Sequence, residues 1–190
     1  KQAGALRIEV TNFVPHDTAA EVMRIRLTNT GKRPVDITPT SFIPLYGRSE
    51  KNLRDHRHVS SLLNRIKLDR FGVILQPTMV FDERGHRLNK TRYYVLGYEG
   101  AGRPPVGQFP TLDAFYGEGD IVAPDAVYRD IPPFSSHEAS FDGKEACAGL
   151  RFRSKILRPQ ETEEYVLVMG IADSEQAILT VFSGLHTPFL

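Results

Sequence analysis

The chain lacks the features that mark several classes of protein. It has a single cysteine, Cys147, among 190 residues, which excludes an internal disulfide framework and favours a reducing compartment. No apolar run approaches the ~18 residues of a membrane-spanning helix, so no membrane partner is expected. The 24 basic and 23 acidic residues nearly cancel, so nucleic acid is not expected as a partner either. Because no signal-peptide pattern is seen, we expect a cytoplasmic protein.

Short strand patterns make up most of what is present. Met23, Ile25 and Leu27 alternate with two arginines, which is the pattern of a strand with one buried face. A turn over 29–34 leads to the next strand. Further strands are expected near 6–10, 35–37, 42–46, 73–75, 79–81, 91–97, 150–156 and 165–171, with Pro44 indicating an edge position or a bend. Repeated short strands joined by turns predict a mainly all-β sandwich, as one domain over residues 1–190.

Two short helices interrupt this β pattern. Thr111 is expected to cap one through Phe115, and residues 173–176 begin another that covers 177–182. Residues 59–66 have apolar side chains at helical spacing between strand-like neighbours, so periodicity leaves that segment open.

The longest irregular segment and the two ends of the strand pattern suggest a functional loop and a larger parent protein. Residues 97–134 contain many Gly and Pro residues and predict an elaborated surface loop, a kind of segment that is often functional. The strand pattern begins at Leu6, and residues 184–190 show no core signal. We therefore expect a domain that belongs to a larger multidomain enzyme.

Two dense groups of ionisable residues are the most informative part of the chain. The first charged segment is Arg54-Asp55-His56-Arg57-His58, and the second is Asp82-Glu83-Arg84-Gly85-His86. Each of these charges must be solvated, paired or used on a partner, because a buried unpaired ion costs several kcal/mol or more. Side chains that donate and accept hydrogen bonds, presented on a β scaffold, are suited to sugar hydroxyls. Five aromatic residues are candidates for an apolar face against a pyranose ring: Tyr46, Tyr93, Phe109, Phe115 and Tyr116.

Three other interpretations compete with sugar binding at these segments. His56 and His58 would share one side of a strand, and Asp82, Glu83 and His86 would add N and O ligands, but neighbouring arginines would repel a cation. We therefore expect no metal.

A pair of catalytic carboxylates is the second interpretation. Asp55 with Asp82 or Glu83 is arithmetically compatible with glycosidase chemistry, although the sequence gives no separation between them. The third interpretation is a structural ion network that joins loops, and it stays open beside the sugar hypothesis. Cys147 has no nearby base in sequence and is interpreted as a small core residue rather than a nucleophile.

The order of several motifs resembles the N-terminal domain of glycoside hydrolase family 94, with the greatest likeness to its 1,2-β-oligoglucan phosphorylase branch. The similarity runs roughly from Leu6 to Phe182. It rests on Asn12-Phe13-Val14-Pro15, the strand and turn over Arg24 to Pro34, the segments 54–59 and 81–86, and Phe109-Pro110-Thr111. The stretch Asp113-Ala114-Phe115-Tyr116-Gly117 also resembles a loop common in the wider family.

The resemblance implies an antiparallel β-supersandwich of the galactose-mutarotase-like type, placed before a helical (α/α)₆ catalytic domain. Family members cleave β-glucosidic bonds with inorganic phosphate as co-substrate and release α-glucose 1-phosphate with inversion. The catalytic acid then belongs to the helical barrel, so no catalytic residue and no cofactor is expected in this chain.

For sites and partners, the resemblance implies a homodimer and a gluco-oligosaccharide cleft. The two charged segments, Asp113 and Phe115 would then be rim contacts to β-glucan or contacts across the dimer. A stand-alone carbohydrate-binding module and a purely structural domain remain the alternatives.

Overall fold

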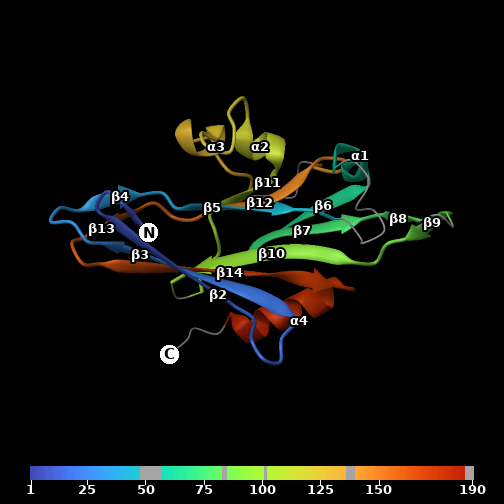
Figure 1. Ribbon diagram of the computed structural model, residues 1–190, viewed down its shortest axis with the longest axis horizontal. Helices are drawn as coiled ribbons and strands as arrows, with labels where there is room; N and C mark the ends of the chain where they lie inside the picture. Colours follow the sequence, from blue (N-terminus) through green and yellow to red (C-terminus); the bar gives the residue numbers. More distant parts are fainter. Residues whose placement is uncertain (48–56, 83–84, 101, 136–139, 187–190) are drawn as a thin grey trace.

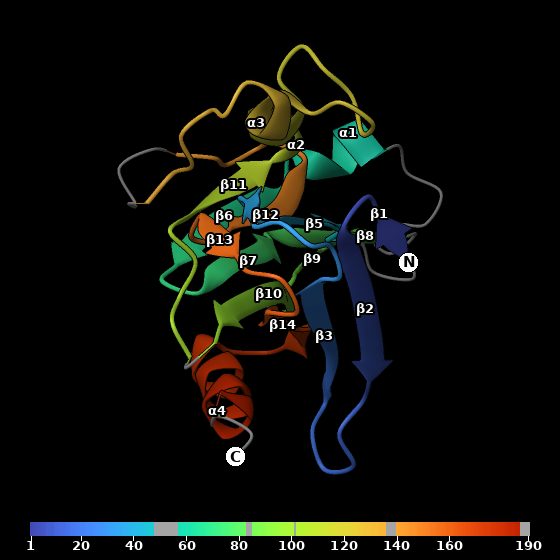
Figure 2. The same cartoon turned by 90° about the vertical axis from the view of Figure 1, so that its left-hand side faces the viewer.

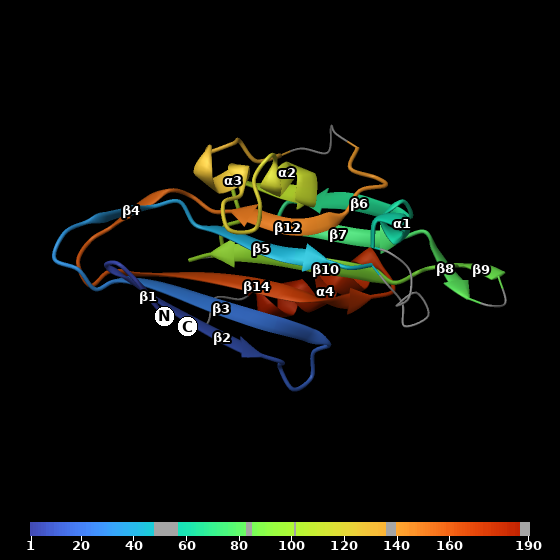
Figure 3. The ribbon, with the colours of Figure 1, turned by 45° about the horizontal axis from the view of Figure 1, so that its top comes forward.

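A computed structural model of the chain describes residues 1–47, 57–82, 85–100, 102–135 and 140–186. Two layers of antiparallel strands face each other (Figures 1 and 3). In sheet order, the larger layer comprises β1 (Gln2–Ala3), β2 (Leu6–Phe13), β3 (Ala20–Asn29), β14 (Thr162–Ala172), β10 (Arg92–Glu99), β7 (Gly72–Pro77) and β6 (Asn64–Asp69). The expectation of an antiparallel β-sandwich is confirmed.

The second layer is a three-stranded sheet, and two separate two-stranded pairs accompany the layers. Its strands are, in order, β11 (Gly107–Thr111), β12 (Ala146–Arg151) and β5 (Thr40–Leu45). The pairs β4 (Val35–Ile37) with β13 (Lys155–Leu157), and β8 (Met79–Asp82) with β9 (Gly85–Leu88), complete the described strands. Pro44 lies on β5, which pairs only with β12 among the described strands, so its predicted edge position is confirmed. A proline at an edge leaves no N–H to recruit a further strand there.

The central strands of the large sheet are apolar on both faces. On β14, Tyr165 and Leu167 pack toward the small sheet, whereas Val166 and Val168 pack on the opposite face. Strand β10 divides in the same way, with Val95 in the first cluster and Tyr94, Leu96 and Tyr98 in the second. Covering both faces turns the period-two pattern into a continuous apolar run.

Helix α4 (Glu175–Leu185) covers that opposite face, as Figure 1 shows below the sheet. Its Ile178 and Phe182 are buried against β10 and β14. The Ser174 hydroxyl accepts a hydrogen bond from the Ala177 amide at 3.2 Å, which satisfies one of the free N–H groups at the helix start. The helix predicted over 177–182 is therefore confirmed and is longer at both ends.

The other described helices are short. They are α1 (Arg57–Ser61), α2 (Leu112–Tyr116) and α3 (Asp125–Tyr128). The predicted cap of α2 is confirmed, since the Thr111 hydroxyl accepts from the Ala114 amide at 3.2 Å. Among the described residues, no helix combines the length and apolarity that crossing a bilayer requires.

The expectation about residues 97–134 was wrong. They are not one surface loop, because they contain β11, which is buried along its whole length, and the helices α2 and α3. The segment 59–66, which periodicity left open, is divided between the end of α1 and the start of β6.

The end of the described chain is anchored to the core rather than free of it. The His186 ring stacks on Phe182 with centroids 5.1 Å apart, and it meets Tyr98 and Phe71 edge-on at 4.8 and 4.9 Å. Its Nε2 lies 2.8 Å from the Gly102 carbonyl oxygen. The expectation that residues from 184 onward lack core contacts is thus wrong for Leu185 and His186.

Candidate functional site

The described elements next to the two charged segments lie at the same end of the large sheet. Helix α1, which follows residues 54–56, precedes β6, and the β8–β9 hairpin follows β7. Strands β6 and β7 are antiparallel with Asn64 opposite Pro77, so the start of β6 and the end of β7 meet. Figure 1 shows α1 and the β8–β9 hairpin at the right-hand end of the sandwich. We call this the hairpin end of the domain.

The predicted sugar-binding residues fall into three groups. Five lie outside the described residues: Arg54, Asp55, His56, Glu83 and Arg84. Arg57 and His58 begin α1 and Asp82 ends β8, each with a described backbone position only. His86 lies on β9 opposite Phe81, and it is exposed.

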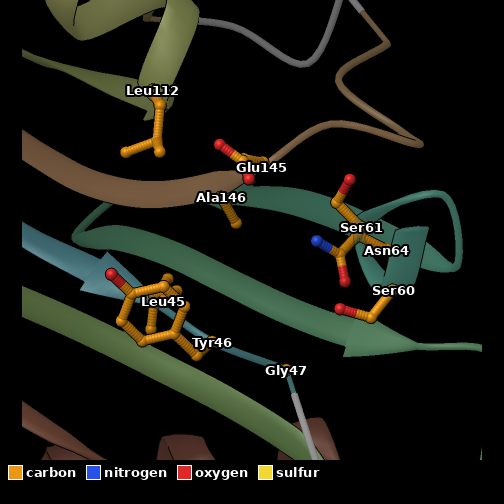
Figure 4. Close-up of a pocket in the computed structure, with 9 residues that line it drawn as sticks. All are labelled: Leu45, Tyr46, Gly47, Ser60, Ser61, Asn64, Leu112, Glu145 and Ala146. Atoms are coloured by element: carbon orange, nitrogen blue, oxygen red, sulfur yellow. The ribbon is translucent and has the colours of Figure 1, made fainter. Parts of the chain in front are cut away.

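A small cleft occupies the hairpin end where β5, α1, β6, α2 and β12 meet (Figure 4). Gly47 and Ser60, which flank the first charged segment in sequence, both line it, opposite Leu112 and Glu145. Its free volume is about 10 Å³, which is the space of about one water molecule. This cleft by itself is therefore too small for a sugar. Leu45 and Tyr46 also line an open groove of about 530 Å³ together with Tyr93, so a sugar contact at this end would be made in that groove or on the surface.

Asp113 is joined to this cleft by a chain of polar contacts. Its Oδ2 lies 3.8 Å from Lys144 Nζ, and its side chain stays 78% exposed. The Lys144 carbonyl accepts a hydrogen bond from Asn64 Nδ2 at 2.8 Å, and the Asn64 carbonyl accepts from the Gly143 amide at 3.0 Å. The structure thus brings Asp113 to the start of β6, the strand that follows α1. Its carboxylate is accessible to a ligand.

Phe115 lies inside the domain instead. It is 4% exposed, its ring stacks on Phe42 with centroids 4.4 Å apart, and it meets Phe109 edge-on at 5.9 Å. Phe109 is completely buried as well. A sugar would reach these rings only if α2 moved away, so in this structure they are packing residues. Tyr46, at 50% exposure, is the candidate aromatic residue that does face solvent beside the cleft.

The sequence matches the model of one protein family, described as the glycosyl hydrolase 94 supersandwich domain, over residues 1–188. The chain belongs to this family. The match accounts for the antiparallel two-layer architecture and for the extent of the domain along the chain.

Other comparisons bear on the fold alone. A polysaccharide lyase of known structure superposes on this supersandwich domain with a TM-score of 0.54 at 9% sequence identity. The match covers 96% of this chain but only 22% of the lyase chain. No curated protein matches the chain in sequence.

The supersandwich domain does contain a structural ion network, away from the charged segments. Glu99 is 3% exposed and its Oε1 lies 2.6 Å from Arg153 Nη1 and 3.5 Å from Arg103 Nε. The Arg153 guanidinium also donates to the Pro104 carbonyl at 3.0 Å. This network fixes the connection between β10 and β11 to the end of β12. No sequence signal predicted this network, because a glutamate at the end of an apolar strand is usually a surface residue.

The described part of this supersandwich domain contains no group of three or more His, Cys, Asp or Glu side chains arranged to hold a metal ion.

Cys147 is buried on β12, as predicted for a core residue, and burial raises the pKa of its thiol to about 12. We expect the folded domain to resist alkylation by iodoacetamide at about pH 8, because the thiolate is the nucleophile. Denatured protein should react rapidly, mass spectrometry distinguishes labelled from unlabelled protein, and rapid labelling of the folded domain would contradict the prediction.

The same thiol makes stability depend on pH. The unfolded chain releases the thiol proton above the ordinary pKa of 9.0, so the free energy of unfolding should fall as the pH rises from about 9 toward about 12.

Proposed function

We propose that this chain is the non-catalytic N-terminal domain of a β-glucan phosphorylase, and that its substrate is a 1,2-β-oligoglucan. The observation that carries the proposal is the family match over residues 1–188. The domain would pack beside a helical (α/α)₆ catalytic domain of the same enzyme, and in a homodimer it would form part of the rim of the glucan cleft. The hairpin end, with both charged segments and Asp113, supplies the rim contacts.

The proposed reaction requires little from this domain chemically. Inorganic phosphate attacks the anomeric carbon, the glycosidic C–O bond breaks, and one carboxylic acid of the helical domain protonates the leaving oxygen. Inversion gives α-glucose 1-phosphate. The rim contacts bind the glucan equally in the ground state and the transition state, so their loss raises KM and leaves kcat unchanged.

The test is release of glucose 1-phosphate from β-1,2-gluco-oligosaccharides and phosphate by the full-length enzyme that contains this domain. Replacing the exposed His86 with alanine should raise KM about tenfold, the effect of losing one polar contact, with unchanged Tm. His16→Ala is the matched control, since His16 is a 96% exposed histidine in the β2–β3 connection. That variant should keep the wild-type KM.

Each other outcome removes a specific part of the proposal. An enzyme that releases no glucose 1-phosphate from these substrates is not this phosphorylase. A His86→Ala enzyme with wild-type KM has no rim contact at β9. A fall in Tm without a change in KM would assign His86 to the structural alternative, in which the charged segments join loops.

A further inference from the structure

A second cavity lies at the opposite end of the β6–β7 hairpin. Strand β6 ends at Asp69 and β7 begins at Gly72. The turn between them lies at the start of β7, whereas the β8–β9 hairpin follows the end of β7. Here the turn lies beside the start of β11 (Figure 2) and encloses about 250 Å³. We call this cavity the turn pocket. Its size is below that of drug-sized ligand sites and fits one sugar ring rather than an oligosaccharide.

Gln108 forms the fixed polar wall of the turn pocket. It is 4% exposed, and its backbone pairs with Phe134 through bonds of 2.7 and 2.9 Å. Its Nε2 donates to the Asp69 carbonyl at 3.1 Å, which sets the orientation of the amide. The amide oxygen is not among the buried unpaired polar atoms of the described residues, so it is open to solvent and can accept a hydrogen bond from a ligand donor.

The turn between β6 and β7 supplies one carboxylate, Asp69, and one guanidinium, Arg70, to the lining. One oxygen of Asp69, Oδ1, accepts from the Phe71 amide at 2.8 Å, which holds the carboxylate in place and leaves Oδ2 for a ligand. The Arg70 guanidinium lies 5.5 Å over the Phe71 ring. Among the described residues it has no ion-pair partner. A carboxylate disfavours an anionic ligand at this position, and the guanidinium disfavours a cationic one.

The lining therefore suits an uncharged ring with several hydroxyls. Arg70 donates, Asp69 and Gln108 accept, and Ser135 adds a hydroxyl that does both. Pro105 and Val106 form an apolar wall for the C–H face of a ring. We propose that the turn pocket binds a single neutral hexose unit, and that it is a glucan contact separate from the hairpin end. The choice of glucose as the hexose rests on the function proposed above.

The test localises binding by hydrogen–deuterium exchange of the full-length enzyme with a β-1,2-gluco-oligosaccharide and no phosphate. We expect slower exchange in peptides that cover 68–72 and 105–109. Arg70→Ala should raise the sugar concentration for half-protection about tenfold, because a charge-assisted hydrogen bond is lost. Val106→Trp, at a 41% exposed position, should abolish protection by filling the cavity. Arg26→Ala removes an exposed arginine from β3 and should change nothing.

Several results would overturn the turn pocket. These are absence of protection in the wild-type protein, protection that survives both Arg70→Ala and Val106→Trp, or stronger protection by a uronic acid than by the neutral sugar. Glucose 1-phosphate release by the same preparations separates the two proposals. Normal release without protection removes the turn pocket alone, and protection without release removes the phosphorolysis assignment alone.

Discussion

Replacing Gly72 with alanine is expected to lower the free energy of unfolding by about 3 kcal/mol, the upper range for overpacking a core. A Cβ atom at this position would lie 2.1 Å from the Val95 carbonyl oxygen and 3.0 Å from the Leu96 Cα. Both are backbone atoms of β10, the neighbouring strand, so no side-chain rotation relieves the overlap. Relief requires β7 and β10 to separate where β7 begins. The midpoint of urea denaturation measures the loss.

Gly184→Ala is the matched control for this substitution. A Cβ atom at Gly184 would meet no atom of the described residues within 4 Å, and the residue lies within the last turn of α4. Alanine there should raise stability by up to about 1 kcal/mol through helix propensity. Replacing glycine with alanine should therefore lower the free energy of unfolding at position 72 and raise it at position 184. Equal effects would mean that β7 and β10 are not packed as closely as described.

The second large effect is expected at Arg151, which is a buried cation at the end of β12. Its side chain is 7% exposed and bonds Asp130 Oδ1 at 2.7 Å, the Ile131 carbonyl at 3.2 Å, and the Ala126 carbonyl. It also lies 5.2 Å over the Phe109 ring. Arg151→Met should cost about 3 kcal/mol, because it leaves these carbonyl groups without a donor. Thermal unfolding measures it, and limited proteolysis should cut within 124–134 more quickly.

Asp130→Asn serves as the control for Arg151. Asp130 is 83% exposed, so water replaces the lost charge and the cost should be below about 1 kcal/mol. If the two variants lost equal stability, the surface ion pair would be the whole contribution of Arg151. The bonds to the Ala126 and Ile131 carbonyls would then contribute nothing.

Sequence periodicity predicted the strands that keep one polar face. Met23, Ile25 and Leu27 all lie on β3 and pack against the core between the sheets, while Arg24 and Arg26 point to the other face. A capping hydroxyl followed by an apolar run was equally informative, since Thr111 and Ser174 both begin helices. Strand alternation and helix capping both depend on residues that are close in sequence, so the sequence alone reveals them.

The burial of strand β11 and of Arg151 could not be predicted by such reasoning. Strand β11 has the sequence Gly-Gln-Phe-Pro-Thr, in which apolar and polar residues do not alternate. It is buried throughout because β12 pairs with it and α2 packs close by. Arg151 follows the polar rhythm of its strand and is nevertheless buried, because the segment near 126–131 folds back over it. Only the tertiary arrangement determines such burial.

The residue types of the candidate site could be predicted from the sequence, but their positions in the fold could not. Sequence singled out the charged segments, and the Asn64–Pro77 register is what brings their neighbouring elements to one end of the sheet. Neither the burial of Phe115 nor the approach of Lys144 to Asp113 has a sequence signal, since both arise from how α2 sits on β12. The turn pocket likewise joins Asp69 to Gln108 across 39 positions of sequence.

The two proposed glucan contacts lie at opposite ends of the β6–β7 ladder. Its six residue pairs, from Asn64–Pro77 to Asp69–Gly72, extend roughly 20 Å at the usual rise of a strand. A disaccharide is shorter than that and could occupy one end of the ladder but not both. On the two proposals, simultaneous contact requires a longer glucan, whose second contact would form as an intramolecular step. Affinity plotted against degree of polymerisation would then rise in a step rather than smoothly, with the ladder as a molecular ruler for the glucan.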